Sequence, residues 1–219
     1  MSLREDYNAL SRRSILSKEI PEFVEDNLNS AFSLREYQKE AIARFMYYID
    51  IEPQKPRPIH LLFLMATGSG KTLLMAADIL YLYKKGFRNF LFFVNSKNII
   101  EKTRDNFLNK QSSKYLFSDK IEVDGKKIQI SEVENFEVTD PNGINIIFTT
   151  IQGLHNLMNA RRENALTYED FKDKKIVIIS DEAHHINAWT KNGLSKSEDE
   201  AKSTWEYTVS RILDSNKDI

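Results

Sequence analysis

Apolar residues along this chain gather in short, nearly continuous runs that alternate with longer amphipathic segments. The runs consist mainly of Ile, Leu, Val and Phe, which is typical of parallel strands buried on both faces. They cover residues 59–65, 90–94, 144–150 and 176–179. In the segments between them, apolar positions recur every three or four residues and predict helices, at about 72–85, 96–107 and 152–159. This alternation indicates an α/β fold, with helices on both faces of a parallel sheet.

The N-terminal region has a different pattern. Residues 1–30 are polar with scattered apolar positions, which predicts one or two short helices packed on the outside of the main domain. Ser33 followed by Glu36 is a capping-box pattern, so we expect a longer helix to begin there. We therefore divide the chain into an N-terminal helical extension, residues 1–32, and a main domain, residues 33–219.

A polar insertion over about residues 109–142 interrupts the alternation and is rich in Lys, Asp, Glu and Ser. Within it, Asp124-Gly125 lies near the middle of alternating apolar and polar residues, which predicts a β-hairpin that leaves the main sheet. The sequence Asp-Pro-Asn-Gly at 140–143 predicts a turn before the next strand. A last short helix is expected near 205–212.

The composition describes a protein of 219 residues with 41% hydrophobic and 29% charged residues, as in an ordinary soluble protein. Cysteine is absent, which excludes disulfides and thiolate metal sites and fits a reducing cytoplasm. No apolar run is long enough to span a bilayer, and the N-terminus lacks the apolar core of a signal peptide. The formal net charge of −1 neither indicates nor excludes a nucleic-acid partner, because a groove can be basic locally.

The first apolar run leads into a glycine-bearing segment, residues 66–72 (Ala-Thr-Gly-Ser-Gly-Lys-Thr), and then into an apolar helix. In this order of strand, loop and helix, backbone N–H groups and the helix dipole face phosphate oxygens. Lys71 would reach the β- and γ-phosphates, and the Thr72 hydroxyl would hold Mg²⁺. Met65 takes the place of the usual first glycine, whereas Gly70-Lys71-Thr72 is intact. The expected phosphate-binding residues are Thr67, Gly68, Ser69, Gly70, Lys71 and Thr72.

A second motif, Asp181-Glu182, follows the last apolar run and places carboxylates at the carboxyl edge of the sheet, where ligands of open α/β sheets bind. Asp181 would hold the Mg²⁺ shell, and Glu182 would orient or deprotonate the attacking water. The alternative is that the pair only caps a helix. A metal site at His184 and His185 is rejected, because adjacent helical side chains point in different directions and no cysteine completes a site. A hydrogen bond beside the nucleotide suits His184 better.

Together, residues 66–72 and Asp181-Glu182-Ala183-His184 resemble motifs I and II of superfamily-two helicases and translocases. The arrangement is more closely similar to the motor subunit (Res) of type III restriction-modification enzymes. The further features that carry this resemblance are Ile20-Pro21-Glu22-Phe23 shortly before Leu34-Arg35-Glu36-Tyr37-Gln38, Met65 at the first loop position, Val94-Asn95-Ser96 ahead of the helix to Phe107, and the second histidine, His185.

The resemblance implies a RecA-like P-loop fold, ATP and Mg²⁺ as cofactors, and ATP hydrolysis coupled to movement on duplex DNA. In such an enzyme Lys71, Asp181 and Glu182 are catalytic, and Gln38 reads the adenine edge with Arg35 and His184 nearby. The alternative for Gln38 is an exposed helical glutamine. The resemblance implies that four residues contact the nucleic-acid backbone: Asn95, Ser96, Thr149 and Thr150. The alternative is that these residues are ordinary helix caps.

The resemblance also implies partners: double-stranded DNA, a DNA methyltransferase subunit, a second motor half and a nuclease domain, in a cytoplasmic protein of bacterial or phage origin. The chain ends before the strand expected to carry motif III, so we expect it to be the first motor half. Without the arginines of the second half it would bind nucleotide but hydrolyse it poorly. The alternatives are a type I restriction motor, another DEAH-like DNA helicase, a P-loop small-molecule phosphotransferase, or an inert nucleotide-binding or assembly module.

Overall fold

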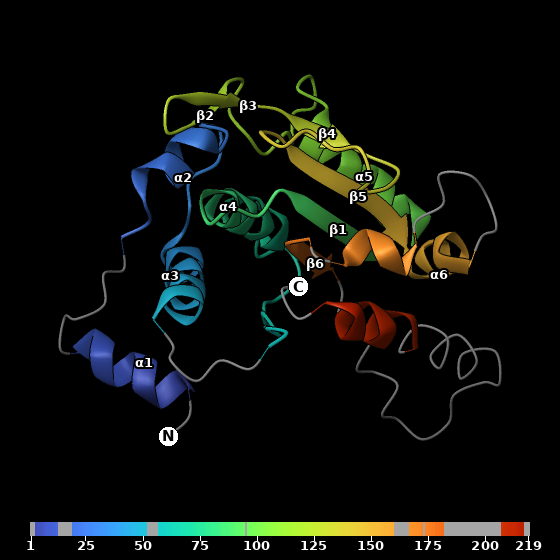
Figure 1. The fold of residues 1–219 in the computed structure, drawn as a ribbon. Coiled ribbons are helices and arrows are strands. Elements are labelled where there is room, and N and C mark those ends of the chain that lie inside the picture. Colours follow the sequence, from blue (N-terminus) through green and yellow to red (C-terminus); the bar gives the residue numbers. More distant parts are fainter. Residues whose placement is uncertain are drawn as a thin grey trace.

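A four-stranded sheet forms the centre of the protein in the computed structural model (Figure 1). The structure describes residues 3–12, 19–51, 57–94, 96–159, 167–172, 174–181 and 207–216. The strands of the central sheet are β1 (Asn89–Val94), β4 (Ile130–Glu132), β5 (Ile144–Thr150) and β6 (Ile176–Ser180). They lie in the order β4-β5-β1-β6, and every neighbouring pair is parallel.

Both faces of the sheet are covered by helices. Alternate side chains of β1, among them Phe90 and Phe92, pack in a core with helices α3 (Glu36–Asp50), α4 (Lys71–Lys84) and α5 (Lys97–Leu108). The intervening residues of β1, Leu91 and Phe93, belong to a second core with α6 (Ile151–Asn159), the 3₁₀ helix η1 (Tyr168–Phe171) and the helical residues 207–215. The predicted α/β fold with a parallel sheet and helices on both faces is confirmed.

Helix α4 is buried almost all round, because the sheet lies on one side of it and helices α2 (Glu22–Asn27) and α3 pack on others. Its apolar composition therefore reflects its central position rather than an amphipathic surface helix. Gly86, with φ of 94°, follows the C-terminal end of the helix. The predicted helices over residues 96–107 and 152–159 correspond to α5 and α6.

The N-terminal helices α1 (Leu3–Arg12) and α2 agree with the expected short helices, and the polar insertion contains the predicted hairpin of β2 (Ile121–Val123) and β3 (Lys126–Ile128). Its turn residues, Asp124 and Gly125, have φ of 55° and 71°, as an Asp-Gly hairpin turn requires. Figure 1 shows α2 beside this hairpin. The buried Asn27 side chain joins them, because it donates to the Glu122 carbonyl and accepts from the Glu122 N–H, both at 2.7 Å.

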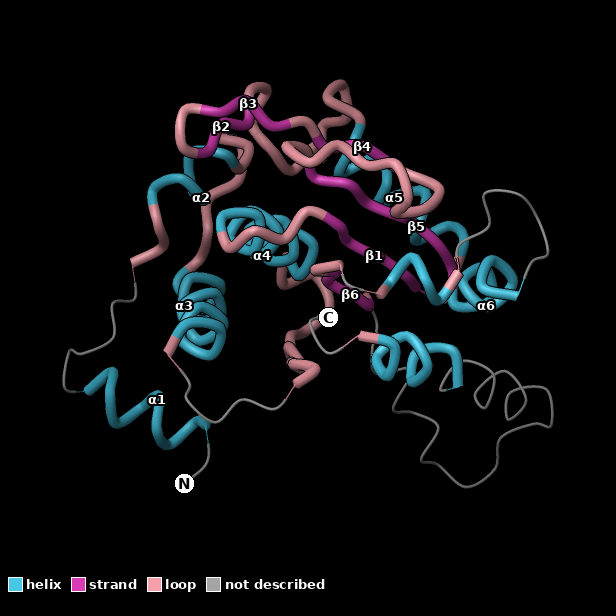
Figure 2. Tube along the Cα trace, in the orientation of Figure 1, coloured by secondary structure: helices cyan, strands magenta, loops and turns pink. Residues whose placement is uncertain are grey.

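The structure corrects three predictions. The apolar run from Ile59 is not a strand: it enters α4 as a loop (Figure 2), and Leu62 and Leu64 are 55% and 86% exposed. A strand is held by a ladder to a neighbour, and the described strands provide none for this segment. The insertion also contributes β4 to the main sheet, which we did not expect.

The third correction concerns the start of α3. The helix begins at Glu36, with Arg35 rather than Ser33 as its N-cap. The reciprocal hydrogen bond is made by Gln38, whose Oε1 accepts from the Arg35 N–H at 2.8 Å. Since this bond closes the first turn around Arg35, the helix starts two residues later than the Ser-x-x-Glu pattern predicts.

No helix among the described residues is long and apolar enough to cross a membrane.

Candidate nucleotide-binding site

The glycine-bearing segment forms a tight turn that continues directly into α4. Gly68 and Gly70 have φ of 77° and 80°, a left-handed conformation that favours glycine. The Ser69 N–H donates to the Ala66 carbonyl at 3.2 Å, and Gly70 caps the helix by accepting from the Leu73 N–H at 3.1 Å. First-turn N–H groups of a helix have no partner within the helix, so this loop and helix start are suited to bind an anion.

The Lys71 ammonium lies beneath this turn. Its Nζ donates to the carbonyls of Met65 and Ala66 at 3.4 and 3.3 Å. Both hydrogen bonds are long and therefore weak, so a phosphate can replace them at little cost. The contact at position 65 uses a backbone carbonyl, so it does not involve the Met65 side chain.

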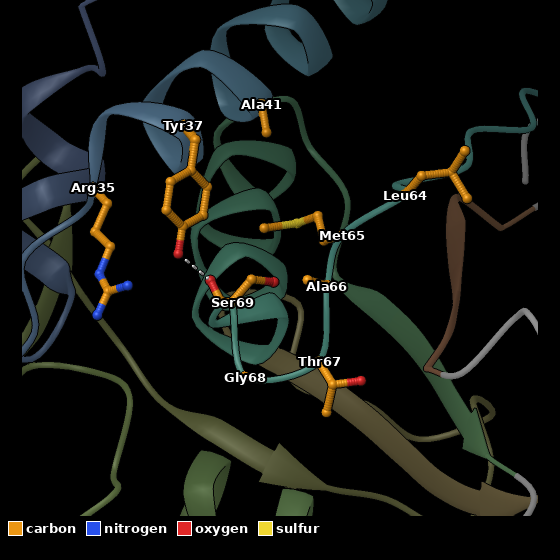
Figure 3. A pocket seen from close by; sticks show the side chains of 9 residues that line it. All are labelled: Arg35, Tyr37, Ala41, Leu64, Met65, Ala66, Thr67, Gly68 and Ser69. Carbon is orange, nitrogen blue, oxygen red and sulfur yellow. Dashed lines mark hydrogen bonds between the residues drawn. The ribbon is translucent and has the colours of Figure 1, made fainter.

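The N-terminal end of α3 is fastened to the same turn. The Gln38 side chain is 3% exposed, and its Nε2 donates to the Ser69 carbonyl at 3.0 Å. The Tyr37 hydroxyl donates to the same carbonyl at 2.9 Å (Figure 3). A Cβ atom at Gly70 would lie 2.4 Å from Gln38 Nε2, so a side chain at this position would displace the Gln38 amide. The Tyr37 contact was not predicted from the sequence, where Tyr37 was named only as part of the segment Leu34-Arg35-Glu36-Tyr37-Gln38.

A cavity of about 600 Å³ opens between this turn and α3. That is large enough for a nucleoside. In Figure 3, Tyr37 points from the first turn of α3 toward Ser69, and Arg35 lies on the other side of Tyr37 from Met65 and Ala66. The residues that line the cavity are Arg35, Tyr37, Ala41, Leu64, Met65, Ala66, Thr67, Gly68 and Ser69.

The oxygen ligands expected for Mg²⁺ lie at the ends of two elements. Thr72 is half-buried in the first turn of α4, and Asp181 follows the last residue of β6. No cluster of three His, Asp or Glu side chains occurs among the described residues. Glu182 and His184 lie outside the described residues, as does His185.

The residues expected to contact nucleic acid lie at or directly after the ends of β1 and β5 in the sequence. The parallel register places these strand ends at the carboxyl edge of the sheet, with Val94 opposite Thr150 and Phe93 opposite Ser180. Thr150 Oγ1 accepts from the Gly153 N–H at 2.9 Å and so stabilises the start of α6. Thr149 is buried, and its hydroxyl donates to the Thr150 carbonyl at 3.2 Å. Both hydroxyls therefore have partners within the domain.

The other two expected contacts lie at the end of β1. Ser96 is the N-cap of α5 but makes no side-chain cap hydrogen bond. Asn95 lies outside the described residues.

A buried acid in α4 was not expected. Asp78 is 8% exposed, its Oδ1 has no hydrogen-bond partner, and burial raises the pKa of this carboxyl well above its usual value. The sequence shows it only as a polar interruption of an apolar helix.

Two comparisons with known proteins place these features in context. A family model described as "Type III restriction enzyme, res subunit" matches residues 31–217. A curated relative from Haemophilus influenzae, the "Probable type III restriction-modification enzyme HindVIP Res subunit", is 43% identical over 214 residues, covering 89% of this chain and 41% of the relative. The chain thus spans about two fifths of that relative's length. No solved structure matches the chain.

Proposed function

Because the chain belongs to the family of type III restriction enzyme Res subunits, we propose that it is the ATP-binding first motor domain of such a subunit. In the complete protein this domain couples ATP hydrolysis to movement on duplex DNA, which leads to endonucleolytic restriction. The observation that carries the proposal is the left-handed glycine turn at the start of α4, with Lys71 beneath it and a nucleoside-sized cavity beside it.

The proposed binding mode follows from this turn. The phosphates of ATP lie on the N–H groups of residues 68–72, and Lys71 exchanges its two long carbonyl contacts for the β- and γ-phosphates. Thr72 and Asp181 supply oxygen ligands to Mg²⁺, which neutralises the charge on the phosphates. We assign Glu182 to the attacking water because it directly follows Asp181 in the sequence.

The proposed partners come from the same family relationship. We propose double-stranded DNA and a modification methyltransferase subunit as partners, the cytoplasm as the location, and a second motor half and a nuclease domain elsewhere in the polypeptide. Arginines from a second motor half stabilise transition-state charge in such motors. We therefore expect this chain alone to bind ATP and to hydrolyse it slowly.

The test is ATP binding by the 219-residue chain in the presence of Mg²⁺, measured by calorimetry or by displacement of a fluorescent nucleotide. Lys71→Ala should weaken ATP binding about tenfold or more, because a charge-assisted hydrogen bond to phosphate is lost. Lys102→Ala is the matched control, since Lys102 is an exposed helical lysine of α5. Equal affinities of the two variants would contradict the proposed site.

Experiment can distinguish the proposed DNA motor from a small-molecule phosphotransferase. In that case a nucleoside or sugar, rather than DNA, would stimulate ATP turnover by the chain. An inert assembly role predicts instead that Lys71→Ala leaves the restriction activity of the parent enzyme unchanged.

A further inference from the structure

The polar insertion carries an excess of lysines. Residues 109–128 contain five lysines and three acidic residues, a net charge of +2, in a chain whose formal net charge is −1. All five lysines are exposed, and together they are called the basic surface: Lys110, Lys114, Lys120, Lys126 and Lys127. Clustered charges of one sign attract a partner of the opposite sign.

The positive charges are not neutralised within the domain. In the part of the chain that the structure describes, none of the five lysines forms an ion pair. Lys110 donates to the Asp119 carbonyl at 2.6 Å, which is a backbone group without charge. Of the three acidic residues, Asp124 is already paired with Lys84 of α4. The basic surface therefore keeps its charge available for a partner.

The lysines stand on a firmly packed base. The β2–β3 pairing places Lys127 opposite Glu122, and Lys120 directly precedes β2. The Lys110 contact brings the end of α5 to the same part of the insertion. The apolar residues of 109–128 are all buried beneath this surface: Tyr115, Leu116, Phe117, Ile121, Val123 and Ile128.

The basic surface lies far from the nucleotide site. Helix α4 begins with Lys71 at the glycine turn, and Lys84 in its last turn pairs with Asp124 of the hairpin. The 14 residues between these points span about 20 Å. In Figure 1 the hairpin and α6 lie at opposite ends of the central sheet, and α6 follows the carboxyl end of β5. The basic surface is therefore separate from the carboxyl edge of the sheet.

The composition of the surface favours the phosphate backbone of a duplex as its partner. Protein–protein interfaces are depleted in lysine and enriched in aromatic residues. Sites for single-stranded nucleic acid combine basic residues with aromatic side chains on which bases stack. In residues 109–128 the aromatic residues are Tyr115 and Phe117, and both are buried. Exposed lysines without aromatic neighbours suit contacts to phosphates.

We propose that the basic surface binds the phosphate backbone of duplex DNA, as a second contact apart from the carboxyl edge of the sheet. The inference rests on the proposed function only in taking DNA as the partner. Because the contacts are made to phosphates, binding at this surface does not depend on the DNA sequence and is weakened by salt.

The experiment measures the affinity of the 219-residue chain for two fluorescently labelled duplexes of unrelated sequence, by anisotropy at a series of salt concentrations. Lys126→Gln combined with Lys127→Gln removes two exposed positive charges. The plot of log affinity against log salt concentration should become shallower by about 2, because each phosphate contact contributes about 0.9 to its slope. Both duplexes should lose the same factor in affinity, about tenfold or more.

A second variant and a control accompany this measurement. Lys114→Gln combined with Lys120→Gln, at two other positions of the basic surface, should change the slope by a similar amount. The control combines Lys102→Gln with Lys172→Gln, which removes the same charge from exposed positions outside the basic surface. The control should leave the slope unchanged.

The outcomes separate this inference from the proposed function. If the wild-type chain binds neither duplex, or if the surface variants and the control have equal slopes, the inference is wrong. If the surface variants keep wild-type DNA binding but no longer bind the purified DNA methyltransferase subunit, the basic surface is a protein interface and the inference is also wrong. ATP binding is measured separately and depends on Lys71, so either proposal can fail while the other stands.

Discussion

Replacing Gly70 by alanine tests the contact between the phosphate loop and α3 most directly. Gly70 has φ of 80°, and a side chain in this conformation costs about 1–2 kcal/mol. The added Cβ would lie 2.4 Å from Gln38 Nε2, so the amide must move. Moving it gives up its bonds to Ser69 and Arg35, each worth about 1 kcal/mol. Gly70→Ala should therefore lower the free energy of unfolding by about 3–4 kcal/mol.

The matched control is Gly68→Ala. Gly68 has a similar φ of 77°, but nothing lies within 4 Å of a Cβ placed there. Only the backbone cost of about 1–2 kcal/mol applies. The difference between the two variants, about 2 kcal/mol, is therefore the cost of displacing Gln38.

Urea unfolding followed by circular dichroism gives the free energies, and a double-mutant cycle isolates the interaction between the two residues. In a Gln38→Ala background, Gly70→Ala should cost only as much as Gly68→Ala does in the wild type. If the two glycine variants cost the same in the wild type, within about 0.5 kcal/mol, the close approach of Gln38 does not constrain the loop and the reasoning is refuted.

Further predictions concern buried polar groups outside the turn. Asn27→Ala should lower the free energy of unfolding, measured in urea titrations, by about 2–3 kcal/mol, because three hydrogen bonds of 2.7 Å to Phe23 and Glu122 are lost. The exposed Asn156→Ala is the control. If both variants lower the free energy of unfolding by the same amount, the prediction is contradicted. Burial raises the pKa of Asp78 above its unfolded value of 3.8, so the folded chain retains this proton as the pH rises and loses stability above about pH 4. Asp78→Asn should therefore stabilise the chain at pH 7 and not near pH 3; parallel stability–pH curves for the two proteins would refute this.

The elements that the sequence predicted correctly are those with a strong local signal. The apolar runs of β1, β5 and β6 and the Asp124-Gly125 turn are examples, since a few consecutive residues determine each of them. The run at 59–65 carries the same signal but has no neighbouring strand among the described residues, and a strand depends on its neighbour. Local pattern cannot reveal whether that neighbour is present.

The site shows the same division between local and long-range information. The glycine turn with Lys71 could be predicted from consecutive residues, because the motif is itself local. The contact of Tyr37 with Ser69 joins residues 32 positions apart, and the solitary Asp78 becomes unusual only once the helix around it is known to be buried. Neither could be predicted without the packing of α3 against α4.

Helix α4 connects two parts of the molecule that lie far apart in the sequence. Its 14 residues form a rod of about 20 Å, with Lys71 beneath the phosphate loop at one end and Lys84 paired with Asp124 of the hairpin at the other. The hairpin is joined in turn to α2 through Asn27. The glycine turn, the hairpin and α2 are therefore connected through one continuous helix, although they lie far apart in the sequence.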